Sequence, residues 1–258
     1  MSTQPRLPAW LHEVRDGARA VTVHHLTRFM PPQDKEAQGT RTGAVLMLFG
    51  GRTRDDGYLL LTERAHHMRS HPGQVSFPGG SVDPGETPVE AALREAEEET
   101  GLDPAGVEVF AELPELWLPP SNFAVTPVLG WWRSPSAVDV VDPDEVHAVF
   151  QAPIVELLDP EHRITVRGPA GWLAPAFLIG PDKDVLLWGF TAGIVGRLFD
   201  FLGWTTEWDT GRVRDVPAYM LQGEPSRTPS RTPSRTPSRM PSRTPSRVPM
   251  PNTTLREP

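Results

Sequence analysis

The sequence predicts an α/β protein in which helices cover both faces of a mixed sheet. Short apolar runs separated by turn residues recur along the chain and are typical of strands. Two segments, residues 87–101 and 188–202, instead space their apolar residues as one face of a helix does. Each such helix needs a sheet to bury its apolar face, so the later one should close the face that the earlier one leaves open.

The elements are expected in a definite order. Residues 8–19 predict a short helix with Trp10, Leu11 and Val14 on one side, and the polar residues 30–42 predict a loop. Strands are predicted at residues 44–49, 58–62, 107–116, 123–132, 146–150, 163–166, 177–179 and 185–187. A short helical turn is predicted at residues 154–158.

The composition limits what the chain can be. Its 258 residues include no cysteine, which excludes disulfides, thiolate metal sites and a cysteine nucleophile. No uninterrupted apolar run has transmembrane length, and the N-terminus lacks the apolar core of a signal peptide, so the expected location is the cytoplasm, with no membrane partner. The formal net charge of −8 makes a general nucleic-acid binder a poor expectation.

The C-terminal segment differs from the rest. Residues 225–248 repeat Pro-Ser-Arg followed by Thr, Met or Val six times, and proline at every fourth position forbids a regular helix. A disordered tail is therefore expected at 225–258. The remainder divides into an N-terminal extension at 1–37 and a main domain at 38–224. We interpret the repeat as a product of replication slippage that has no function. The alternative interpretation is a basic tether that kinases phosphorylate.

Residues 87–101 carry clear signals for a helix start and a helix end. Thr87 suits the N-cap, Pro88 the first helical position, and Glu90 completes a capping box. Gly101 stands where a left-handed C-cap would end the helix. The helix should therefore be well defined.

Three glutamates on this helix predict a metal site. Glu95, Glu98 and Glu99 are spaced i, i+3 and i+4, so their carboxylates should converge on one surface patch. Hard oxygen ligands suit Mg²⁺ or Mn²⁺. The preceding loop contains Gly79 and Gly80, which would let the backbone approach the metal and a bound phosphate.

The segment from Gly80 to Leu102 resembles the 23-residue Nudix box. Fixed positions are filled by Gly80, Glu86, Arg94, Glu95, Glu98, Glu99 and Gly101, and aliphatic positions by Ala96 and Leu102. The resemblance implies the Nudix α/β/α sandwich with a mixed sheet and hydrolysis of a nucleoside diphosphate derivative. Arg94 would hold the carboxylates with bidentate hydrogen bonds.

A second motif lies upstream. Residues 60–80 match the coenzyme A diphosphatase pattern Leu-Leu-Thr-x-Arg-(Ser/Ala)-x3-Arg-x3-Gly-x3-Phe-Pro-Gly-Gly at every fixed position. The resemblance implies hydrolysis of CoA, and of acyl-CoAs, to 3′,5′-ADP and 4′-phosphopantetheine or its acyl form. Arg64 and Arg69, with Gly79 and Gly80, are then candidates for binding the substrate, since arginine suits phosphate.

The catalytic base is expected among carboxylates near the attacking water. Glu95 and Glu98 are candidates within the box, and Glu145, on a loop before a strand, is a candidate outside it. The expected partner is a small-molecule substrate; homodimerisation is left open.

Alternatives remain at this point. The chain could be a Nudix hydrolase of ADP-ribose or of dinucleoside polyphosphates, or a non-catalytic Nudix-like module. Histidines 66, 67 and 71 suggest a metal site, but neighbours 66 and 67 cannot both face one ion from a strand, which disfavours it.

Overall fold

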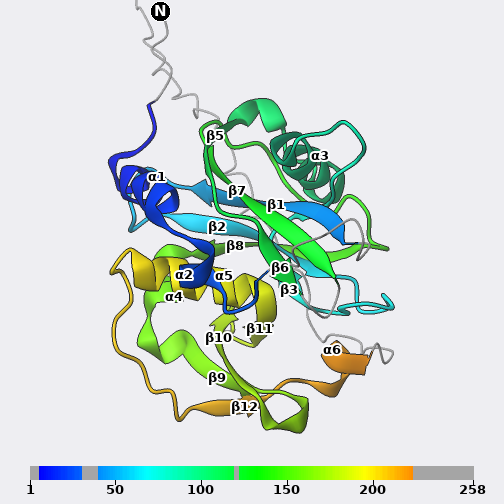
Figure 1. Cartoon of the computed structure of the whole chain (residues 1–258), viewed down its shortest axis with the longest axis vertical. Helices are drawn as coiled ribbons and strands as arrows, with labels where there is room; N and C mark the ends of the chain where they lie inside the picture. The colour runs from blue at the N-terminus through cyan, green and yellow to red at the C-terminus, as the bar shows by residue number, and fades with distance from the viewer. Residues whose placement is uncertain (1–5, 31–39, 119–121, 223–258) are drawn as a thin grey trace, which may run out of the picture. The chain divides into compact units, whose positions relative to one another are not determined.

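The computed structural model describes residues 6–30, 40–118 and 122–222, which belong to one compact unit. It contains an eight-stranded mixed sheet and a separate four-stranded sheet (Figure 1). The strands of the first sheet are β1 (Arg41–Gly50), β2 (Tyr58–Arg64), β3 (Val75–Ser76), β4 (Gly79–Ser81), β5 (Val107–Glu112), β6 (Leu116–Leu118), β7 (Phe123–Trp132) and β8 (Val146–Pro153).

The first sheet is centred on β1. That strand runs parallel to β7, with Leu46 opposite Val128, and antiparallel to β2 and β4. Strand β2 in turn pairs antiparallel with β3 and with β8. Because parallel and antiparallel pairs occur together, the mixed sheet predicted from the sequence is confirmed.

Helices cover both faces of this sheet. The α-helices are α1 (Ala9–Ala20), α2 (Val23–Leu26), α3 (Pro88–Thr100), α4 (Ile154–Leu158), α5 (Gly189–Phe201) and α6 (Ala218–Gln222). Helix α3 shares a buried cluster with Leu46 and Leu60, whereas α1 and α5 share another with Phe49 and Leu61. Figure 1 shows α3 on one side of the sheet and α5 on the other. The predicted three-layer arrangement is therefore present.

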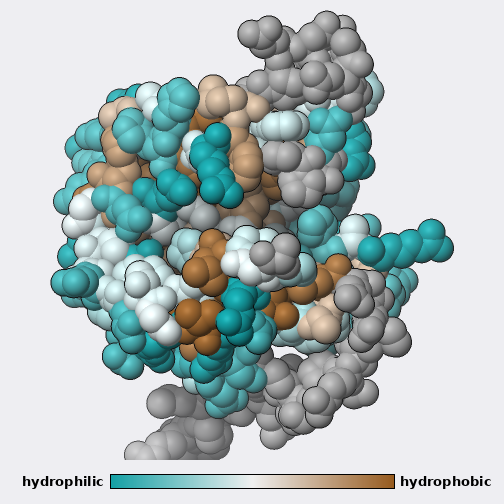
Figure 2. Space-filling view, turned by 60° about the horizontal axis from the view of Figure 1, so that its bottom comes forward, coloured by the Kyte–Doolittle hydropathy of each residue, from teal (hydrophilic) through white to brown (hydrophobic). Residues whose placement is uncertain are grey.

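The predicted strands after residue 160 form a sheet of their own. Its order is β11-β10-β9-β12, from β9 (Arg163–Arg167), β10 (Leu173–Ile179), β11 (Val185–Leu187) and β12 (Val213–Asp215). Figure 2 shows the molecule turned so that the lower part of Figure 1 comes towards the viewer. Apolar residues, coloured brown, interrupt a largely polar surface there. Exposed apolar side chains of this region include Trp172, Leu173 and Val213.

Several predicted boundaries were wrong. The strand predicted at 107–116 is interrupted after β5, where Pro114 has no N–H to donate to a neighbouring strand. Strand β1 begins at Arg41, inside the predicted loop 30–42. The short elements α2, β3, β4, β12 and α6 were not predicted, and β4 lies where the sequence predicted a glycine-rich loop. The proposed tail at 225–258 lies outside the described residues.

The predicted helices fare better. Helix α1 is shifted by one residue from the expected 8–19, α4 matches residues 154–158, and α5 occupies most of 188–202. Among the residues that the structure describes, no helix is long and apolar enough to cross a membrane.

Candidate active site

Helix α3 is fixed at both ends by the caps that its sequence predicts. The Thr87 hydroxyl accepts a hydrogen bond from the Glu90 amide at 3.2 Å, and the Glu90 carboxylate accepts one from the Thr87 amide at 2.8 Å. Gly101 adopts φ 69°, the left-handed conformation that glycine reaches without steric cost. The helix therefore holds its glutamates on a rigid backbone.

Arg94 is the centre of a carboxylate cluster. Its Nε and Nη2 donate to the two oxygens of Glu86 at 2.9 and 3.0 Å. Its Nη1 donates to Glu95 at 2.9 Å and to Glu98 at 3.1 Å, and Nη2 also reaches the Ser81 carbonyl at 3.0 Å. One guanidinium thus positions two of the three candidate metal ligands, and its hydrogen bond lowers the pKa of Glu86.

Glu86 has a positioning role that sequence reasoning missed, beyond its fixed place in the box. Its two carboxylate oxygens form a fork against Arg94, and this fork sets the direction from which the guanidinium reaches Glu95 and Glu98. The signal that could have found it is its place at a fixed distance before the arginine in the box.

The glycines at residues 79 and 80 allow close approach. A Cβ on Gly80 would lie 2.5 Å from the Glu95 carboxylate, and a Cβ on Gly79 would lie 2.4 Å from the Ala44 carbonyl oxygen. The contact at Gly79 is with the backbone of β1, whereas the contact at Gly80 is with the end of the Glu95 side chain. Glycine at residue 79 therefore lets β4 lie close to β1, and glycine at residue 80 leaves room for the Glu95 carboxylate.

Glu99 is the most unusual carboxyl group of the cluster. It is 6% exposed, and burial raises its pKa to about 8, an effect that the charge of Arg64 and the Gly79 amide partly oppose. Its Oε2 is buried without a hydrogen-bond partner in the described part of the chain. Desolvation likewise raises the pKa of Glu95. The predicted surface patch is thus partly an interior site.

These residues fit a divalent cation. The donors are carboxylate oxygens, which suit hard ions, and the partnerless buried oxygen of Glu99 would gain a ligand bond. Besides burial, neighbouring negative charges raise the pKa of Glu95 and Glu99, and a cation would relieve that repulsion.

The candidate residues outside the box differ in how close they lie to the carboxylate cluster. Arg64 ends β2 close enough to Glu99 to lower its pKa, and Glu145 is close enough to both Glu95 and Glu99 to raise theirs. Arg69 is exposed, on the loop between β2 and β3, and has no hydrogen bond or ion pair within the described ranges. The fold therefore brings Arg64 and Glu145 to the carboxylates and leaves Arg69 at the surface.

Comparison with known proteins decides the family. A model of the NUDIX domain matches residues 39–168, which include the whole carboxylate cluster. The chain belongs to the Nudix hydrolase family. Members of this family generally need a divalent metal ion, typically Mg²⁺ or Mn²⁺, in agreement with the donors of this site.

Named relatives agree on the family. The chain is 38% identical over 183 residues to "Uncharacterized Nudix hydrolase NudL" of Escherichia coli O7:K1, covering 67% of this chain and 90% of that protein. It is 46% identical over 102 residues to "Nudix hydrolase 3" of Caenorhabditis elegans, covering 39% of this chain but only 42% of that protein. It is 39% identical over 171 residues to "Nudix hydrolase 15, mitochondrial" of Arabidopsis thaliana, covering 61% of this chain and 56% of that protein.

Proposed function

We propose that this Nudix hydrolase cleaves the diphosphate of coenzyme A, and of acyl-CoAs, to 3′,5′-ADP and 4′-phosphopantetheine or its acyl form. The observation that carries the proposal is the complete upstream motif at residues 60–80, which ends in the glycines over Glu95 and Glu99. Its first arginine, Arg64, adjoins the carboxylate cluster. Substrate phosphates bound beside the metal would therefore meet a cation that the general Nudix box does not supply.

The proposed chemistry divides among a few side chains. Glu95, Glu98 and Glu99 would hold Mg²⁺ or Mn²⁺, which offsets the charge of the transition state and lowers the pKa of water. Arg94 keeps Glu95 and Glu98 in place through its Nη1 hydrogen bonds. Buried Glu99 loses its proton more readily next to a cation, which matches a ligand role.

A carboxylate must also accept a proton from the attacking water. Glu95 and Glu98 are candidates, but both are bonded to Arg94. Glu145 is exposed and has no such guanidinium partner in the described chain, so it is the better candidate for the base. Arg64 and Arg69 are proposed to bind phosphates of the substrate, Arg69 after movement of its exposed loop.

The domain division belongs to the same proposal: residues 38–224 form the hydrolase domain, after an extension at 1–37 and before a tail at 225–258. The packing of α1 in the cluster of α5 and β2 supports an extension that stabilises the domain.

The test is a set of diphosphates incubated with Mg²⁺ or Mn²⁺, with products identified by mass. The proposal expects 3′,5′-ADP and 4′-phosphopantetheine from CoA, and no product after chelation of the metal. If only ADP-ribose or dinucleoside polyphosphates react, the substrate assignment fails while the family assignment stands. If no diphosphate reacts with any metal, the hydrolase proposal itself is wrong.

A further inference from the structure

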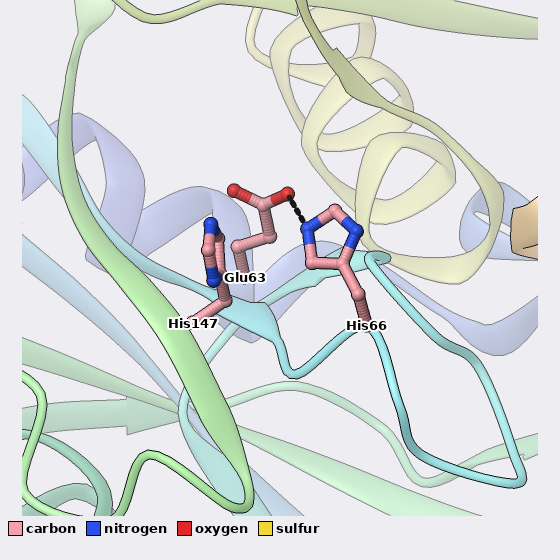
Figure 3. Close-up of side chains that lie close together, drawn as sticks. All are labelled: Glu63, His66 and His147. Atoms are coloured by element: carbon pink, nitrogen blue, oxygen red, sulfur yellow. Dashed lines mark hydrogen bonds and ion pairs between the residues drawn. The ribbon is translucent and has the colours of Figure 1, made fainter. Parts of the chain in front are cut away.

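A second group of potential metal ligands lies outside the Nudix box. Glu63, His66 and His147 each offer one ligand atom, and these atoms all lie within 4.8 Å of one another. Figure 3 shows the two imidazoles on either side of the Glu63 carboxylate, which is hydrogen-bonded to His66. Within the described ranges, this is the one group of three such residues gathered so closely.

The group faces away from the carboxylate cluster. Leu60 of β2 packs with α3, whereas Leu59 and Leu61 pack with the cluster on the other face. Since successive side chains of a strand alternate, Glu63 points to the face of Leu59 and Leu61, and Arg64 points towards α3. Adjacent residues of β2 therefore serve different sites.

An irregularity in β8 brings in the third residue. Glu63 lies opposite Ala148 and Arg64 opposite Val146, so His147 is the extra residue of a β-bulge. In a regular strand, His147 would point to the face opposite that of Ala148. The bulge turns the His147 side chain towards His66, and the two ring centroids lie 4.6 Å apart.

The first two residues are held before any ion binds. Glu63 is 8% exposed, and its Oε1 lies 2.9 Å from His66 Nε2. Tyr219 of α6 stacks on the His66 ring, with centroids 5.5 Å apart and planes 18° apart. The Nδ1 atom of His66 is buried and has no hydrogen-bond partner among the described residues.

We propose that Glu63, His66 and His147 bind a transition-metal ion of the zinc class, at a site separate from the box glutamates. Two imidazoles and one carboxylate are a known ligand set for Zn²⁺, with the fourth position left to water. Ligand bonds of about 2.0–2.2 Å require ligand atoms roughly 3.3–3.5 Å apart in a tetrahedron. The Glu63–His66 pair is already near that spacing, and rotation of the exposed His147 side chain would close the remainder.

Binding there would join three segments of the chain. The ion would link the end of β2, the following loop and β8, beneath the Tyr219 ring. The same loop carries Arg69, so its mobility should fall when the site is filled. The ion itself would not contact the diphosphate, because Glu63 and Arg64 face opposite sides of the sheet.

The test is a Zn²⁺ titration of the full chain in excess Mg²⁺, using a competing chromophoric chelator, with Co²⁺ as a spectroscopic substitute. The parent should bind one Zn²⁺, and the Co²⁺ form should show the absorption of a low-coordinate nitrogen-ligated ion. His147→Ala, a change of an exposed side chain, should weaken binding at least about tenfold, as should Glu63→Gln.

Two controls separate this site from the neighbouring histidine and from the box glutamates. His67→Ala removes the adjacent imidazole, which is 65% exposed and next to Asp144 instead, and should leave Zn²⁺ affinity unchanged. Glu98→Gln alters the box and should also leave it unchanged. The proposal is overturned if the parent binds no Zn²⁺, if His147→Ala and Glu63→Gln, both folded by circular dichroism, bind as the parent does, or if Glu98→Gln abolishes binding.

Discussion

Two clusters of side chains use opposite faces of β2, and they differ in how the chain assembles them. The carboxylate cluster takes its main groups from α3 and the loop before it, a short continuous stretch organised by Arg94. The histidine cluster joins Glu63 and His66 to His147, which is far along the chain and aimed by a bulge. The first cluster offers carboxylate oxygens alone, and the second offers two imidazole nitrogens with one carboxylate, so the two sets of donors would favour different ions.

The largest effect should follow a change in the carboxylate cluster alone. Glu98→Gln keeps the shape of the side chain but removes one negative charge, and kcat should fall at least ~100-fold, the scale of single electrostatic groups in catalysis. Folding should be little affected, because Glu98 is 59% exposed. Steady-state kinetics with saturating Mg²⁺ provide the measurement.

The matched control is Glu97→Gln, on the exposed side of the same helix. The kcat of this variant should be close to that of the parent. Near-normal turnover of Glu98→Gln, or an equal loss in Glu97→Gln, would remove the metal assignment from this face of α3.

A smaller effect is expected at the loop that connects the two clusters. Arg69→Ala should lower kcat/KM for CoA about tenfold or more, because a hydrogen bond to a charged group is worth roughly 1.5–3 kcal/mol. Comparison with dephospho-CoA, which lacks the 3′-phosphate, identifies the phosphate involved. Unchanged CoA kinetics would mean that Arg69 is an ordinary surface residue.

The buried carboxyl group should make the stability of the metal-free protein depend on pH. The pKa of Glu99 rises from 4.5 to about 8 on folding, so the folded state retains a proton that the unfolded state loses. Stability should therefore fall as pH rises from about 4.5 through about 8. Glu99→Gln removes this contribution, and its melting temperature relative to the parent should be higher above about pH 8 than at about pH 5.

Thermal melts with a chelator present measure that difference. Added Mg²⁺ should stabilise the parent above about pH 8 and have less effect on the variant. If the difference in melting temperature between the parent and Glu99→Gln is the same at both pH values, the assigned burial of Glu99 is wrong.

The smallest effect is expected from the C-terminal repeat. Removal of residues 225–258 should leave activity and melting temperature unchanged, because the sequence, with proline at every fourth position of 225–248 and few apolar residues, predicts no packing against the domain. A clear fall in either quantity would place the tail within the domain. Parent and truncated protein should be compared in the same buffer.

Local signals explain what could be predicted from the sequence. The caps of α3 depend on Thr87, Glu90 and Gly101, all within one helix, and the geometry follows the prediction. The contacts of Arg94 with Glu95 and Glu98 also lie within a turn or so of helix. Such arrangements depend little on the rest of the fold.

Contacts between segments far apart in the sequence explain what could not be predicted. The burial of Glu99 depends on β4 and on Arg64, and the meeting of His66 with His147 depends on the pairing of β2 with β8 and on one extra residue. The side chains at 66 and 67 diverge, since His66 bonds to Glu63 whereas His67 lies near an exposed aspartate. Nothing in the sequence around residue 147 signals the bulge, so His147 was not predicted as a ligand.

The most direct test of the central claim is the ratio of kcat/KM for CoA to that for ADP-ribose, measured on the parent protein with Mg²⁺. The upstream motif, with Arg64 beside the carboxylate cluster, predicts that CoA is the better substrate by about tenfold or more, from one charged contact to a phosphate that ADP-ribose lacks. A higher kcat/KM for ADP-ribose than for CoA would contradict the proposed function.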